Sequence, residues 1–147
     1  IGNARQFKEW LELRDILETE SAALAAVRRS EDDLIRLRDR IDDMQCAQEE
    51  ESMERSDVEF HLALAEAAGN GLLARSLETL FVTLSSAMRE SRRLWLFAEQ
   101  SQAVRLAEEH RAILEAVAAQ DAALARDRMA AHLQKVEISL RQLIDQG

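Results

Sequence analysis

The sequence predicts an all-α protein that folds as an antiparallel bundle of six to seven helices, and three observations support this class. The chain of 147 residues has the length of one domain, and its hydrophobic fraction of 47% is enough to form a core. It contains no proline and only four glycines, of which Gly69 and Gly71 are the interior ones. A sheet protein needs many more turn residues, whereas apolar residues recur here at helical spacing nearly throughout.

A serine cap separates the first two predicted helices. The spacing predicts a helix over residues 4–29 and a second one that starts after Ser30, a preferred N-cap residue. Asp33 stands at the third helical position, and Glu31 and Asp32 add negative charge where the helix dipole favours it. The apolar face of this second helix consists of Leu34, Leu37, Ile41 and Met44.

Glycine and aspartate mark the boundaries of the remaining predicted helices. The third helix is expected over residues 56–68, and it should end at Gly69-Asn70-Gly71, because glycine and asparagine tolerate the left-handed conformation. The fourth is expected over residues 72–97 and the fifth over residues 102–119. The sixth should start after the cap residue Asp121 and run to about residue 144. Because the connections are short, neighbouring helices should be antiparallel.

The charge balance argues against a nucleic-acid surface on this chain. Its formal net charge is −9, from 28 acidic and 19 basic residues, whereas binding to phosphates requires a basic surface. No apolar run is long enough to span a membrane, and no secretory leader is expected. Cys46 is the only cysteine, which excludes an intrachain disulfide and fits a cytoplasmic location. We interpret the acidic run at residues 49–51 as a solvated surface.

Three histidines occupy positions where core residues are expected. Asp57 and His61 are one helical turn apart, so they project from the same side of the third predicted helix. His110 and His132 lie on the inward stripes of the fifth and sixth. The stripe of His110 includes Ala103, Leu106, Ile113 and Val117, and that of His132 includes Ala125, Met129, Val136, Leu140 and Leu143.

A single divalent cation would satisfy these buried polar groups together. Three imidazoles and a carboxylate buried at separate places would each need a partner. An ion held by Asp57, His61, His110 and His132 removes that need, and such ligands suit Zn²⁺ as well as Ni²⁺, Mn²⁺ or Fe²⁺. The alternative is that each histidine is a core or half-exposed residue with its own hydrogen bond.

The sequence lacks the common catalytic motifs. It contains no His-Glu-x-x-His, no Glu-x-x-His pair, no glycine-rich phosphate loop and no Gly-x-Ser-x-Gly. A centre of three histidines and one aspartate would leave coordination positions open for water or for a small organic acid. Such an ion could act in catalysis, but no histidine would remain as a general base. A purely structural metal is the other alternative.

Two arginines are candidates for binding a carboxylate. Arg14 falls on the apolar face of the first helix, where a guanidinium needs an anion, and a bidentate carboxylate fits best. The alternative for Arg14 is a salt bridge to Glu18 or an extension to solvent. Arg92 lies on the inward stripe of the fourth predicted helix beside Trp95. Its alternative is a solvated basic turn near the helix C-terminus.

The ordered motifs resemble a known family. The segments Asp57-Val58-Glu59-Phe60-His61 and Ala67-Ala68-Gly69-Asn70 are similar to the D-x-x-F-H … A-x-x-N signature of the FCD domain. This is the C-terminal, effector-binding domain of the FadR subfamily of GntR-type transcription regulators. Residues 12–26, 109–116 and 129–133 resemble its first and last two helices. The likeness covers nearly the whole chain, so residues 1–147 are expected to form one effector-binding and dimerisation domain.

The resemblance implies a central cavity with a metal ion at its floor. In the metal-binding branch the ligands are one aspartate and three histidines, which match Asp57, His61, His110 and His132. Zinc is the first choice, and relatives that respond to fatty acyl compounds lack this site. Family effectors are small carboxylates, and Arg14 matches the family arginine of the first helix. Asn70 and Arg92 are further effector-binding candidates, and residues 85–92 resemble the branch that responds to lactate and related 2-hydroxy acids.

The family architecture also includes a part that this sequence does not show. An N-terminal winged helix-turn-helix domain binds DNA in the family, and no such segment precedes Ile1. The implied function is therefore that of a cytoplasmic, homodimeric sensor domain without enzymatic activity. It would control DNA binding only through that missing domain, because the effector would favour one bundle geometry over another.

Overall fold

The computed structural model describes residues 4–87 and 103–146, and these residues form helices and no strand. The helices are α1 (Ala4–Arg28), α2 (Glu31–Cys46), α3 (Glu50–Ala67), α4 (Gly71–Ala87), α6 (Ala103–Ala118) and α7 (Ala122–Gln146). The predicted all-α class and the six predicted helices are confirmed. Residues 88–97, assigned in the sequence analysis to the fourth helix, lie outside the described residues.

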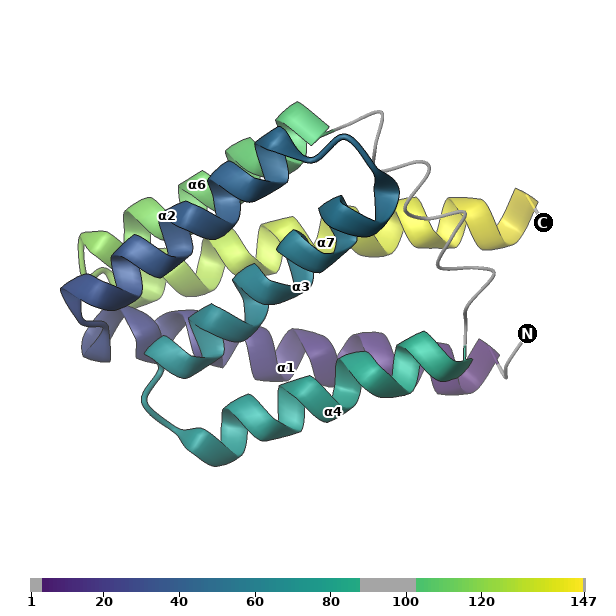
Figure 1. Ribbon diagram of the computed structural model, residues 1–147. Helices are drawn as coiled ribbons and strands as arrows, with labels where there is room; N and C mark the ends of the chain where they lie inside the picture. The colour runs from purple at the N-terminus through teal and green to yellow at the C-terminus, as the bar shows by residue number, and fades with distance from the viewer. Residues whose placement is uncertain (1–3, 88–102, 147) are drawn as a thin grey trace.

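The helices form an antiparallel bundle. Figure 1 shows α1 and α7 side by side, with α1 starting and α7 ending at the same end of the molecule. The chain reverses between α2 and α3 and again between α3 and α4, and α4 then returns alongside α1. Besides α7, α1 contacts α3, α4 and α6, so it lies at the centre of the packing.

The helix boundaries follow the capping chemistry of the sequence. Ser30 accepts a hydrogen bond from the backbone N–H of Asp33, whose carboxylate accepts one from the N–H of Ser30. Asp121 accepts from the backbone N–H of Leu124 at 3.0 Å and so caps α7. Gly69, with a φ of 72°, ends α3 in the left-handed conformation. These boundaries agree with the sequence-based ones.

One predicted boundary was wrong, because α3 begins at Glu50 rather than at Ser56. Met53 is buried, so this first part of the helix also packs against the core. Glu50 and Glu51, which belong to the acidic run predicted to be solvated surface, are the first two residues of this helix.

The described part of the predicted apolar stripes contributes to the core, which forms two clusters. The larger one includes the α2 stripe, of which Leu37 and Ile41 are fully buried. The smaller one lies where α1, α3, α4 and α7 meet, around Trp10 and Leu77. No helix in the described part of the chain has the length and apolarity needed to cross a bilayer.

Candidate metal centre

Three helices contribute side chains to one buried polar cluster. Asp57 and His61 come from α3, His110 from α6 and His132 from α7. All four residues are buried, and each offers a potential ligand atom within 4.8 Å of the others. The structure thus brings together the four residues that the sequence analysis predicted to converge.

The distances in this cluster suit atoms that share one ion. Oδ1 of Asp57 lies 3.1 Å from Nε2 of His110 and 3.4 Å from Nε2 of His61. The two Nε2 atoms are 3.3 Å apart. Ligand atoms about 2.1 Å from one ion, at tetrahedral or octahedral angles, are separated by about 3.0 to 3.4 Å. Oδ1 of Asp57 makes no hydrogen bond of good geometry to the described residues, so it remains available as a ligand.

Aromatic side chains enclose the imidazoles. The ring of Phe60 lies 4.5 Å from that of His110 and 5.6 Å from that of His61, and Phe81 lies 6.2 Å from His61, as measured between centroids. Phe60 belongs to the larger apolar cluster, and Phe81 packs against the smaller one. The polar centre therefore lies between two apolar regions, where unpaired charge would be costly.

Charge in the cluster is shared between imidazoles and carboxylates. Burial lowers the pKa of His61, but Glu18 and Asp57 outweigh it and raise that pKa to about 9. Burial lowers the pKa of His110 to about 4, against the opposing effect of Asp57. Burial raises the pKa of Asp57, but His110 and His61 hold it well below its usual value. A cation at this centre would replace the positive charge of the His61 proton.

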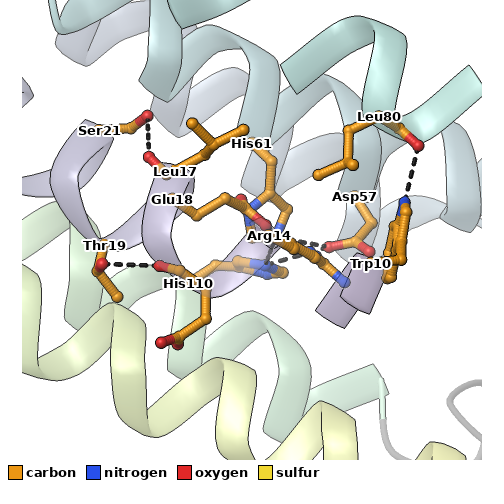
Figure 2. Close-up of polar contacts among 11 residues, drawn as sticks. Trp10, Arg14, Leu17, Glu18, Thr19, Ser21, Asp57, His61, Leu80 and His110 are labelled. Carbon is orange, nitrogen blue, oxygen red and sulfur yellow. Dashed lines mark hydrogen bonds and ion pairs between the residues drawn. The ribbon is translucent and has the colours of Figure 1, made fainter. Parts of the chain in front are cut away.

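Glu18 of α1 is a member of the site that the sequence analysis did not connect with the histidines. Its Oε1 pairs with Nδ1 of His61, and its Oε2 pairs with Nε of Arg14. Figure 2 shows Glu18 beside these two residues. Burial raises the pKa of Glu18, but His61 and Arg14 lower it to about 2. The sequence did contain a signal for Glu18, because this residue is one helical turn from Arg14 on the inward face of α1. Its contact with α3, however, depends on packing between helices.

Arg14 is buried, as predicted, with 3% of its surface exposed. The alternative of a salt bridge to Glu18 is confirmed. Its guanidinium also lies 5.5 Å from the ring of Trp10 and 5.2 Å from that of Phe81. Only Nε is bound to Glu18, and the two terminal nitrogens make no hydrogen bond to the described residues. Arg14 also lines a pocket of about 390 Å³ between α1 and α7.

Glu109 of α6 is the second residue that the sequence analysis missed. Its Oε1 accepts a hydrogen bond from Nδ1 of His132 at 2.7 Å. Its Oε2 lies 3.3 Å from Nε of Arg105 and 3.8 Å from Nζ of Lys135. Burial raises the pKa of Glu109, but His132 and the two cations lower it below its usual value. The partners come from different helices, so no spacing in the sequence indicates this contact.

Asn70, another predicted effector-binding residue, does not join this cluster. Asn70 is exposed, and its Oδ1 accepts hydrogen bonds from the backbone N–H groups of Leu72 and Leu73, both at 3.1 Å. It is therefore a helix cap of α4. Its role in effector binding stays a prediction. Arg92 lies outside the described residues. The predicted central cavity stays a prediction.

Comparison with known protein families gives a match over most of the chain. The FCD domain model matches residues 9–135. The chain is 42% identical over 131 residues to the HTH-type transcriptional regulator LutR of Bacillus subtilis, covering 88% of this chain and 60% of LutR. It is 32% identical over 133 residues to the putative L-lactate dehydrogenase operon regulatory protein of Escherichia coli, covering 90% of this chain and 50% of that protein. The chain thus spans about half of the curated relatives it matches.

Solved structures share the same fold. Escherichia coli McbR/YncC superposes with a TM-score of 0.78 at 24% identity, over 95% of this chain and 70% of that one. Lar, which controls the Listeria monocytogenes agr system, superposes with a TM-score of 0.81 at 20% identity, over 97% and 66% of the two chains. The family predicted from the D-x-x-F-H and A-x-x-N motifs is confirmed, and the chain belongs to the FCD domain family.

Proposed function

We propose that this chain is the ligand-sensing domain of a transcription regulator and binds both a divalent metal ion and a small carboxylate effector. The observation that carries this proposal is the convergence of four buried ligand atoms, from Asp57, His61, His110 and His132, within 4.8 Å. The names of the curated relatives support the regulatory part, because LutR and the Escherichia coli relative are both named as regulators.

The four residues suit zinc best among the candidate ions. Three imidazoles and one carboxylate complete the usual four-coordinate zinc site, and zinc expands to five ligands when a further oxygen binds. Ni²⁺, Mn²⁺ and Fe²⁺ accept the same donors. When bound, the ion would supply a coordination position for an effector oxygen. Glu18 contacts both His61 and Arg14. An ion held by Asp57 and His61 would therefore lie near the guanidinium of Arg14.

Arg14 is the residue that we propose to bind the effector carboxylate. Its terminal nitrogens have no hydrogen-bond partner among the described residues, and it lines the pocket between α1 and α7. A buried guanidinium with two available terminal NH₂ groups is suited to a planar carboxylate. The name of the Escherichia coli relative refers to an L-lactate dehydrogenase operon. L-lactate, a 2-hydroxy acid, is therefore the first probe.

Control of DNA binding would require a domain outside this chain. The chain covers 60% and 50% of its two curated relatives, so each of those proteins contains further residues that this chain does not match. We propose a homodimer in the cytoplasm in which the effector alters the placement of two winged-helix domains. The effector must bind one bundle geometry more tightly than the other, because equal affinities would shift nothing.

The two alternative functions, a metal-dependent enzyme and a domain with a structural ion, have different requirements. A metal-dependent enzyme acting on a small acid needs a general base, and all three histidines of the chain are in the cluster. A purely structural ion needs no effector. Turnover of L-lactate by the zinc-loaded domain would favour the enzyme. Stabilisation by zinc without any response to carboxylates would favour the structural ion.

The test combines metal analysis with thermal unfolding. Elemental analysis of domain purified without added metal should find about one divalent ion per chain. L-lactate should raise the Tm of the loaded domain. At a concentration of 100 Kd it should increase the free energy of unfolding by about 2.7 kcal/mol. L-lactamide, which lacks the carboxylate, should have no effect, and neither should L-lactate after chelation. If no small carboxylate stabilises the loaded domain, the sensing function is wrong.

A further inference from the structure

Two of the three histidines are held by a carboxylate on the ring nitrogen that faces away from the cluster. Nδ1 of His61 pairs with Oε1 of Glu18, and Nδ1 of His132 donates to Oε1 of Glu109 at 2.7 Å. Nδ1 of His110 is buried without a hydrogen-bond partner among the described residues. The contacts to Glu18 and Glu109 leave the Nε2 atom of each ring available to face an ion.

Each of these carboxylates is also anchored by a cation. Arg14 holds the second oxygen of Glu18, and Arg105 and Lys135 lie near the second oxygen of Glu109. Glu18 is fully buried on α1, whereas the side chain of Glu109 retains 12% exposure on α6. The carboxylates therefore have fixed positions and stay ionised, so that they are able to hold the imidazole N–H groups.

We propose that Glu18 and Glu109 are positioning residues, which fix His61 and His132 in the tautomer that presents Nε2 to the metal ion. This inference rests on the metal site proposed above. A carboxylate on the far nitrogen orients a ligand imidazole and increases its basicity, and its removal typically weakens metal binding 10- to 100-fold. His110, which lacks such a partner among the described residues, is oriented by packing against Phe60, 4.5 Å between ring centroids.

Glu18 has a further role because it is shared. It contacts a proposed metal ligand with one oxygen and the proposed effector-binding arginine with the other. A change at Glu18 therefore affects both the orientation of His61 and the position of Arg14. Glu109 has no such link to Arg14 in the described structure, so its loss should affect zinc binding alone.

Zinc affinity, measured by competition with a chromophoric chelator, tests the proposal on the whole chain. Glu18→Gln and Glu109→Gln keep the size of the side chain but remove its charge. At about pH 9, where a proton on His61 competes only weakly with the ion, each should weaken zinc binding 10- to 100-fold. Glu20→Gln is the matched control, because Glu20 is an exposed residue of α1 paired with Arg126 and lies outside the centre. Its zinc affinity should equal that of the parent chain. If Glu18→Gln does not fold, Glu109→Gln still decides the result.

The tautomer of His132 provides a measurement that does not depend on metal. In the metal-free chain, ¹⁵N chemical shifts of the ring should place its proton on Nδ1, and Glu109→Ala should move the proton to Nε2. A purely structural role of Glu109 would lower the stability and leave the tautomer of the folded protein unchanged.

The outcomes separate the two proposals. If the parent chain binds no divalent ion, the proposed function fails, and the tautomer of His132 still tests the positioning role. If the His132 proton lies on Nε2 in the parent chain, or if Glu109→Gln binds zinc as tightly as the parent chain, the positioning role is overturned.

Discussion

Trp10 and Leu80 connect α1 to α4 through one side-chain hydrogen bond, in which the indole Nε1–H donates to the Leu80 carbonyl oxygen at 2.8 Å. Figure 2 shows this contact beside Arg14 and Asp57. The same indole ring lies 5.5 Å from the Arg14 guanidinium. Trp10 therefore fixes α4 to the part of α1 that carries the proposed effector-binding arginine.

Replacement of Trp10 by phenylalanine should lower the free energy of unfolding. The smaller ring keeps much of the apolar contact but removes the indole donor. Because the Leu80 carbonyl lies inside α4 and remains in the helical hydrogen-bond pattern, the expected loss is that of one hydrogen bond, about 0.5 to 1.5 kcal/mol. Denaturant unfolding measures the loss. Val82→Thr serves as the control, because Val82 is exposed on the same helix, and it should change stability by less than about 0.5 kcal/mol. Equal stability of Trp10→Phe and the parent chain would contradict the role of this bond.

Replacement of His110 by alanine should weaken zinc binding by more than the 10- to 100-fold expected for a positioning residue, because it removes a ligand. Isothermal titration calorimetry measures the change. Cys46→Ser is the control, since Cys46 is an exposed thiol outside the cluster and also a potential zinc ligand. A loss of zinc binding in Cys46→Ser, with His110→Ala unaffected, would show that the ion binds elsewhere.

The affinity for zinc should rise with pH up to about pH 9. In the metal-free domain Glu18 and Asp57 raise the pKa of His61 to about 9, so the ion must displace a proton below that pH. His110, with a pKa lowered to about 4, requires no proton loss near neutrality. The affinity should therefore increase about tenfold per pH unit between pH 7 and pH 8.5. Chelator competition at several pH values checks the slope, and a flat profile would refute it.

The metal-free domain should show the opposite trend. A histidine whose pKa is raised on folding stabilises the folded state fully below its unfolded pKa, about 6.5, and this contribution is lost as pH rises through the folded pKa. For His61 the window is from about pH 6.5 to about pH 9. The Tm of the chelated domain should fall across this window. A Tm that rises with pH would show that Glu18 does not stabilise the charged form of His61.

Replacement of Gly69 by alanine should destabilise the domain by about 1 to 2 kcal/mol. Gly69 has a φ of 72°, which is costly for residues with a Cβ atom. A Cβ atom there would also lie 3.2 Å from Cδ of Arg28, which donates to the Ala68 carbonyl oxygen. Gly71→Ala is the matched control, because Gly71 starts α4 and a Cβ atom there meets only the end of Arg75. Thermal unfolding of both variants should show the loss only for Gly69→Ala.

The fold was predictable because local chemistry determines most boundaries. Ser30, Gly69 and Asp121 each cap or end a helix through contacts within a few residues, and such contacts are visible in the sequence. The start of α3 was missed, because the polar first turn around Glu50 is helical partly through packing of Met53 on the core.

The candidate site was predictable in part. His110 and His132 are recognisable because they interrupt apolar stripes that the core requires, and Asp57 is one turn from a third histidine. The role of Glu18 and Glu109 was not predictable, because each contacts a histidine of another helix. The helix-capping contacts of Asn70 involve residues two and three positions on, and its role in effector binding stays a prediction.

The distribution of the four cluster residues over α3, α6 and α7 has a consequence for folding kinetics. Asp57 and His132 lie in distant parts of the chain, so these side chains meet only after the last helix has docked. An ion held there would contribute little to the folding transition state. It should therefore lengthen the lifetime of the native state while leaving the refolding rate nearly unchanged.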